Sequence, residues 1–121
     1  MTELGRAVDS AVLDELRESV GDDPVFLAEL VDELLQDAPA QLESLRSAAT
    51  SGDATGARRA AHTLKGNGRT FGAGELASLC QEAETAAAAG DLDAVLSRLD
   101  EIDGAWHRVC AELLVWRDNR G

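Results

Sequence analysis

Residues 22–53, DDPVFLAELVDELLQDAPAQLESLRSAATSGD, carry the strongest structural pattern of the chain. An aspartate followed by a proline is typical of a helix start, because Asp caps free backbone N–H groups and Pro fits the first helical position. Apolar residues then recur at steps of three and four: Leu27, Leu30, Val31, Leu34, Leu35, Ala38, Leu42, Leu45 and Ala49. This spacing predicts one long amphipathic helix that ends at Gly52. Pro39 lies inside it and is expected to kink the helix or to split it into two pieces.

Four other segments show the same helical spacing, and each is bounded by Asp or Gly. The predicted helices run from Asp9 to Gly21, from Asp53 to Gly72, from Gly74 to Gly90 and from Asp91 to Trp116. Short Gly-Asp turns between long helices favour antiparallel neighbours. We therefore predict an all-α fold, an up-down-up-down antiparallel four-helix bundle with a short additional N-terminal helix. Residues 1–8 form a lead-in, residues 9–116 one helical domain and residues 117–121 a C-terminal tail.

Composition limits the partners that the chain can have. Its 121 residues carry a formal net charge of −12, which argues against nucleic acid and anionic membranes. No apolar run is long enough to cross a membrane and no signal sequence is recognisable, so we expect a cytoplasmic protein. Cys80 and Cys110 lack a CxxC spacing and are expected to be reduced core thiols. The apolar faces are used within the predicted bundle, which favours a monomer.

The segment from Ala54 to Gly74 differs from the rest of the chain in charge. It holds four basic residues and no acidic one, which gives it a local charge of +4 and leaves −16 on the remainder. It also holds His62, one of two histidines, and Lys65, the only lysine. A positive region around one imidazole, on an acidic body, suits a site where negative charge appears transiently.

Helical geometry predicts where these side chains point. At about 100° per residue, Leu64 lies about 200° from His62, so a buried Leu64 leaves the histidine facing solvent. The same arithmetic places Lys65, Gly66 and Arg69 on the histidine side, and Arg58 and Arg59 lie one turn earlier. Gly66 and Gly68 each weaken a helix by about 1 kcal/mol, which suggests that something approaches the backbone there.

Few chemistries fit these residues. The chain has no Ser-His-Asp arrangement, no GxSxG, and no phosphate-binding GxGxxG or GxxxxGK motif. Di-iron bundles need a Glu three residues before each His, whereas Arg59 precedes His62 and Gly104 precedes His107 at that spacing. We expect no metal site, no cofactor and no enzyme acting alone. A neutral imidazole is, however, a competent nucleophile, so His62 is either a carrier of a phosphoryl group or a surface histidine without a role.

The run His62-Thr-Leu-Lys-Gly66, followed by Gly72-Ala73, Leu76 and Cys80-x-x-x-Glu84, resembles the histidine-containing phosphotransfer (HPt) domain of bacterial phosphorelays. The resemblance implies a four-helix core, with His62 as the phospho-accepting residue, Lys65 as the cation beside the phosphate and Gly66 leaving room for a receiver domain. Asn67-Gly68 departs from the small Ser or Ala residues usual in the family, so a looser helix end is expected. Ala83 replaces a larger apolar residue, which should affect packing alone.

The predicted function is therefore phosphoryl transfer in two-component signalling. His62 would accept the group from a receiver aspartate or a histidine kinase and pass it to another receiver, whose own Mg²⁺ assists the step. Arg58, Arg59 and Arg69 are candidate phosphate- or partner-binding residues. Gln36 is a further candidate, because it should lie level with the histidine segment in an antiparallel hairpin. The alternative is a non-phosphorylated adaptor or inhibitor that binds a receiver domain or kinase.

Overall fold

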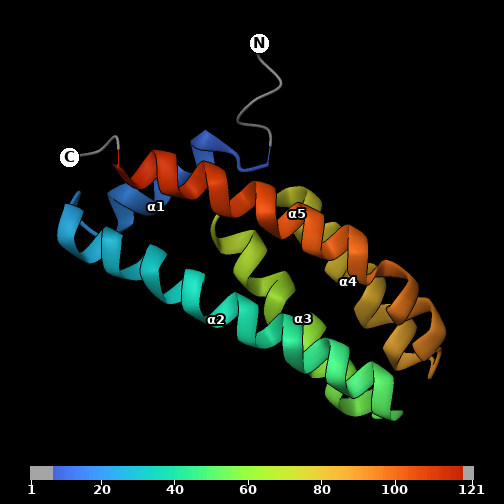
Figure 1. Ribbon diagram of the computed structural model, residues 1–121. Helices are drawn as coiled ribbons and strands as arrows, with labels where there is room; N and C mark the ends of the chain where they lie inside the picture. The colour runs from blue at the N-terminus through green and yellow to red at the C-terminus, as the bar shows by residue number, and fades with distance from the viewer. Residues whose placement is uncertain (1–6, 119–121) are drawn as a thin grey trace.

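The computed structural model describes residues 7–118, which form five α-helices and no strand within that range (Figure 1). The helices are α1 (Ser10–Ser19), α2 (Pro24–Ser51), α3 (Ala54–Thr70), α4 (Gly74–Ala88) and α5 (Leu92–Asp118). The all-α prediction is confirmed. The rest of the predicted lead-in and tail, residues 1–6 and 119–121, lies outside the described residues.

Aspartate side chains begin four of the helices, as the sequence predicted. The backbone N–H groups of Ala11, Val25, Gly56 and Ala94 donate to the carboxylates of Asp9, Asp23, Asp53 and Asp91, respectively. Each bond satisfies a donor that the first turn of a helix leaves free. Gly52 ends α2 in the left-handed conformation, at φ +84°, which glycine adopts without steric cost.

Helix α2 runs unbroken through Pro39, so of the two predicted effects, a kink or a split, the split is wrong. Pro39 is exposed on the outer face of the helix. The carbonyl group that loses its helical donor therefore lies on the same outward side, where water can replace the missing bond. The inner face is buried as the apolar spacing predicted, including Leu27, Val31 and Leu45.

Four of the helices pack in a closed ring, in which α2 contacts α3 and α5, and α4 contacts the same two helices. Their shared core includes fully buried side chains from every member of the ring: Leu45, Leu64, Leu76, Ile102 and Leu113. Helix α1 lies at the end of the molecule where α2 begins and α5 ends (Figure 1). None of the helices described is both long and apolar enough to span a membrane.

Both ends of the described chain are more tightly held than the sequence suggested. Ala7 and Val8, assigned to the lead-in, are buried, and their backbone N–H groups donate to the Glu112 carboxylate at 3.0 Å each. Arg117, assigned to the tail, lies within α5 and pairs with Asp32 of α2. Residues 7, 8 and 117 thus contact the helices, although the prediction placed them outside the helical domain of 9–116.

Candidate functional site

Helix α3 presents His62 to solvent, as the angular argument predicted. Ala57, Ala61 and Leu64 are fully buried on the opposite face of the helix, whereas 67% of the His62 side chain is exposed. The Asp53 cap and the apolar stripe together fix the rotation of α3 about its axis. The exposure of the imidazole is therefore set by the packing of the helix.

A carboxylate from the neighbouring helix holds both the histidine and the lysine. Glu84 of α4 places one carboxylate oxygen, Oε2, 3.0 Å from His62 Nδ1, and the other, Oε1, 2.7 Å from Lys65 Nζ. Lys65 Nζ also donates to Gln81 Oε1 at 3.0 Å. Three side chains from α3 and α4 thus form one connected cluster, His62–Glu84–Lys65, which we call the histidine clamp.

The charges of the clamp determine which ring nitrogen of His62 carries the proton. The hydrogen bond from Lys65 holds the pKa of Glu84 below its usual value of 4.5, against the opposing effect of burial, and His62 lowers it further. Glu84 is therefore ionised at neutral pH and can only accept hydrogen bonds. Nδ1 of a neutral His62 must then carry the hydrogen, which leaves the lone pair on Nε2.

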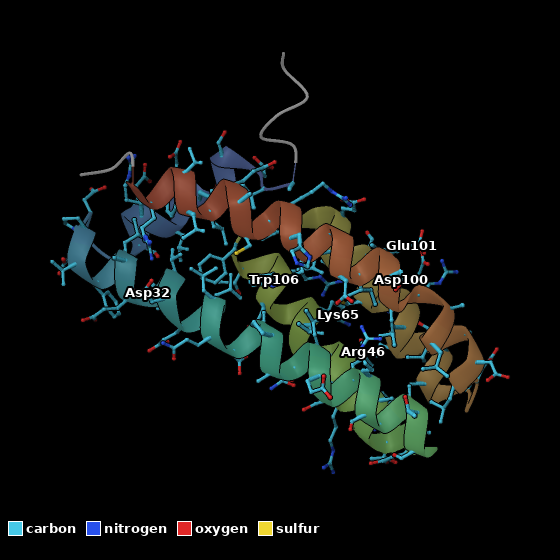
Figure 2. All side chains as sticks on the ribbon, in the orientation of Figure 1. Asp32, Arg46, Lys65, Asp100, Glu101 and Trp106 are labelled. Atoms are coloured by element: carbon cyan, nitrogen blue, oxygen red, sulfur yellow. The ribbon has the colours of Figure 1, made fainter. Side chains whose placement is uncertain are left out.

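Lys65 lies in a different environment from the one expected. The resemblance implied a cation beside the phosphate on His62, but only 9% of the residue is exposed, and its ammonium group lies between Glu84 and Gln81. The side chain extends from the middle of α3 (Figure 2). Lys65 is the only buried charged residue among those described, so its charge is held in place beside the histidine.

Glu84 is the site residue that the sequence analysis missed. It was quoted in the family motif but was given no role, whereas in the structure only 18% of its side chain is exposed. Helical spacing along α3 carries no information about a group supplied by α4. The available signal was the Cys80-x-x-x-Glu84 spacing within the motif that carried the family resemblance.

The remaining candidates fall into three separate grooves. Arg58 and Arg59 line an open groove of about 360 Å³ together with His62 and Glu84. Arg69 instead borders a groove formed by the start of α1 and the start of α4. Gln36 lines a third groove with residues of α1, α2 and the end of α3. The structure thus groups the first two arginines with the histidine, and Arg69 and Gln36 lie in other grooves.

Two of the three glycines of α3, Gly66 and Gly68, have different surroundings. No atom outside the neighbouring helical backbone lies within 4 Å of a β-carbon built on Gly66, one turn from His62. A β-carbon on Gly68 would lie 3.2 Å from the carbonyl oxygen of Ala73 and 3.3 Å from the β-carbon of Ala77. The absence of a side chain at Gly68 therefore lets α4 pack closely against α3, whereas at Gly66 it leaves an open surface. Despite the expected looseness, α3 remains helical to Thr70.

The two cysteines form no disulfide, and the second histidine bonds to the backbone of its own helix. Burial raises the pKa of the Cys80 thiol to about 12, and Cys80 and Cys110 are both free. His107 lies on α5 and donates from Nδ1 to the carbonyl oxygen of Asp103 at 2.7 Å. Between residues 7 and 118, no group of three or more His, Cys, Asp or Glu side chains is placed to hold a metal ion.

An all-α fold that presents one exposed, oriented histidine is the arrangement expected of a phosphotransfer domain. A sequence model of the Hpt domain family matches residues 29–113, and the chain belongs to this family. It is similar to a solved structure, the crystal structure of histidine-containing phosphotransfer protein B (HptB) from Pseudomonas aeruginosa PAO1. The two share 30% sequence identity over 95% of this chain and 97% of the other, with a TM-score of 0.85. No curated protein sequence matches significantly. The chain is thus a histidine phosphotransfer domain of phosphorelays.

Proposed function

We propose that His62 is the residue that accepts and donates the phosphoryl group, and that Nε2 is the atom that carries it. The observation that carries the proposal is the contact between the Glu84 carboxylate and His62 Nδ1. An ionised carboxylate can only accept, so the hydrogen is expected on Nδ1 and the lone pair on Nε2 of a side chain that is 67% exposed. His107 also has a hydrogen on Nδ1, held by the carbonyl oxygen of Asp103, but no carboxylate of residues 7–118 is paired with its ring to stabilise a cation there. The exchange takes place with an aspartate of a receiver domain or with a histidine kinase.

The transfer step does not require the ring of His62 to lose a proton. Nε2 of neutral His62 attacks the phosphorus of an aspartyl phosphate, so an N–P bond forms while the O–P bond breaks. The bonding electrons leave with the aspartate carboxylate, and the ring becomes a cation that still holds its hydrogen on Nδ1. Glu84 accepts that hydrogen bond and is placed to stabilise the cation. The reverse step returns the group to an aspartate.

Lys65 supplies the counter-charge in this proposal. A phosphoryl group adds negative charge beside Glu84, and two like charges at short distance repel. The Lys65 ammonium, 2.7 Å from the Glu84 carboxylate, reduces that repulsion without having to move into place. Gly66 leaves the surface next to His62 open, which supports the approach of a receiver domain along α3.

The protein acts as a carrier and not as an enzyme on its own. Phosphoryl transfer depends chiefly on positioning and electrostatics, so the Mg²⁺ and the acidic residues can come from the receiver, and no cofactor is needed here. We further propose a cytoplasmic monomer in which α2–α5 follow one another up and down as antiparallel neighbours. The ring of helix contacts and the short connections support that topology.

The test is incubation with a phosphorylated receiver domain, followed by mass spectrometry under alkaline conditions, in which phosphohistidine survives. A phosphate-sized mass gain should map to His62 and disappear in His62→Gln. His107→Gln is the matched control, since it removes the other histidine and should be labelled normally. Label that persists in His62→Gln would show the assignment to be wrong. A complex that forms without any label would favour the non-phosphorylated adaptor.

A further inference from the structure

The arginines of the described chain fall into two groups according to their partners. Five pair with carboxylates, most of them across two helices: Arg17, Arg46, Arg98, Arg108 and Arg117. The other three belong to α3 and have no carboxylate of residues 7–118 within ion-pair distance: Arg58, Arg59 and Arg69. The chain has 23 acidic residues for 11 basic ones, so unpaired arginines run against its composition.

The unpaired arginines lie along the same side of α3 as His62. Arg58 precedes His62 by four residues, about 6 Å along the helix axis, and Arg69 follows it by seven, about 10 Å. Around the helix axis, the positions of Arg58 and Arg69 both lie within about 40° of the position of His62, at 100° per residue. Arg59 shares the groove of His62 and Glu84. The open surface at Gly66 lies between the two ends of this row.

We infer that Arg58, Arg59 and Arg69, the arginine row, recognise an acidic protein surface that surrounds the phosphoryl-exchanging residue of the partner. The inference rests on the proposed function, because it assumes that a partner docks over His62. It adds the chemistry of the partner: carboxylates on both sides of that residue, spread over about 16 Å, the axial length of the row.

The charge of the whole molecule strengthens this inference. The chain carries a net charge of −12, so an acidic partner is repelled by most of its surface. At about 0.15 M salt the screening length is about 8 Å, so nearby charges dominate over the distant body. The arginine row then offers such a partner an attractive approach along α3, which is the side where His62 lies. The same charges that attract the partner would also orient it.

A competing role for these arginines is to hold the phosphoryl group on His62 after transfer. That role would affect the lifetime of phosphohistidine and the transfer rate once the partner is bound. Recognition of the partner would instead affect the association rate, since charges at the rim of an interface act mainly on that rate. The two roles can therefore be distinguished, because one changes the phosphohistidine lifetime and the other changes the association rate.

The experiment compares two double variants with equal net charge. Arg58→Gln/Arg59→Gln removes two unpaired arginines of the row, and Arg46→Gln/Arg98→Gln removes two paired arginines elsewhere. Arg46 of α2, labelled in Figure 2, pairs with Asp103 of α5. Arg98 of α5 pairs with Glu82 of α4. Each variant changes the formal net charge from −12 to −14 by the loss of two positive charges. A global charge effect therefore cancels in the ratio of their rates.

Association of each variant with one receiver domain that forms a complex with the wild type is measured by stopped-flow fluorescence. The row variant should associate about five- to tenfold more slowly than the control variant at low salt. The ratio should shrink to less than about twofold near 1 M salt, where the screening length is about 3 Å. Arg69→Gln should slow association in the same direction.

The outcomes separate the inference from the function on which it rests. Equal association rates of the two double variants, with His62 still labelled, overturn the arginine-row inference and leave the carrier function intact. Equal association with a shorter phosphohistidine lifetime in the row variant assigns the arginines to the phosphoryl group and also overturns it. A wild type that binds the receiver and is never labelled overturns the carrier function, and the rate ratio still decides whether the row recognises an acidic partner.

Discussion

Replacing Gly66 with alanine is expected to make the protein more stable and a poorer phosphoryl carrier. Gly66 and Gly68 are both inside α3, two residues apart, and glycine weakens a helix at either position. Their surroundings differ, because a β-carbon has free space at Gly66 and meets backbone atoms of Ala73 and Ala77 at 3.2 Å at Gly68. The pair therefore separates the intrinsic cost of glycine from the reason for its presence.

The expected magnitudes follow from these contacts. Alanine at position 66 gains about 0.8–1 kcal/mol of helix propensity and loses nothing to packing, so the midpoint of thermal unfolding should rise by about 4 °C. Alanine at position 68 gains the same propensity but must push α4 away, and overpacking costs about 1–3 kcal/mol. The Gly68→Ala variant should therefore lie between unchanged stability and a loss of about 2 kcal/mol.

The assay combines urea unfolding, followed by circular dichroism, with phosphoryl transfer from a labelled receiver domain. Gly66→Ala should reduce the second-order transfer rate about tenfold, because a methyl group in a close interface costs on the order of 1–3 kcal/mol. Gly68→Ala is the comparison for stability alone, because its methyl group displaces α4, which carries Glu84 of the histidine clamp. A Gly66→Ala variant that transfers at the wild-type rate, or that unfolds at lower urea concentration than the wild type, would refute this reasoning.

Three other substitutions or reactions test the clamp and the core. Glu84→Gln should flatten the pH dependence of the unfolding free energy. The pKa of Glu84 is lowered in the folded protein, so the stabilisation from its carboxylate is complete above the usual value of 4.5. This stabilisation is lost as the pH falls through the lowered folded value. Stability of wild type and variant, measured between pH 6 and about pH 3, should converge towards acid, and parallel curves would contradict this. Lys65→Met keeps the apolar stem but leaves the Glu84 carboxylate without its cation. The unfolding free energy should therefore fall by about 1–3 kcal/mol, and phosphoryl transfer from the receiver should slow. An unchanged transfer rate would show that Lys65 has no part in the transfer. Cys80, whose thiol pKa is raised to about 12 by burial, should react with a thiol reagent only at the rate of unfolding, whereas Cys110 is partly exposed and should react faster; equal rates in the folded protein would refute the buried assignment.

The helices could be predicted from the sequence because their determinants are local. Asp caps, glycine stops and three-four spacing of apolar residues act within one segment, and each of them appears where expected. The effect of Pro39 was less predictable, because it depends on which side of α2 faces water. The burial of Ala7 and Val8 depends on Glu112, which is more than 100 residues away in the sequence. No local pattern signals such a contact.

The same distinction applies to the site. Exposure of His62 follows from the rotation of its own helix, so the angular argument found it. The position of the Lys65 ammonium depends on how a long side chain folds back against α4, and helical angles locate only its first atoms. The position of Gln36 was predicted from its height along an antiparallel helical hairpin. That prediction placed it near the end of α3 but did not specify which groove it would line.

The histidine clamp depends on how closely α3 and α4 approach, and small residues set that distance. These helices share the most extensive contact of any pair in residues 7–118, and Gly68 packs directly against the backbone of Ala73 and Ala77. A glutamate side chain is short, so Glu84 can reach 3.0 Å from His62 Nδ1 and 2.7 Å from Lys65 Nζ only across a narrow interface. Close packing thus fixes the imidazole tautomer from a second helix. The glycine that weakens α3 locally is, by this argument, part of what orients the nucleophile.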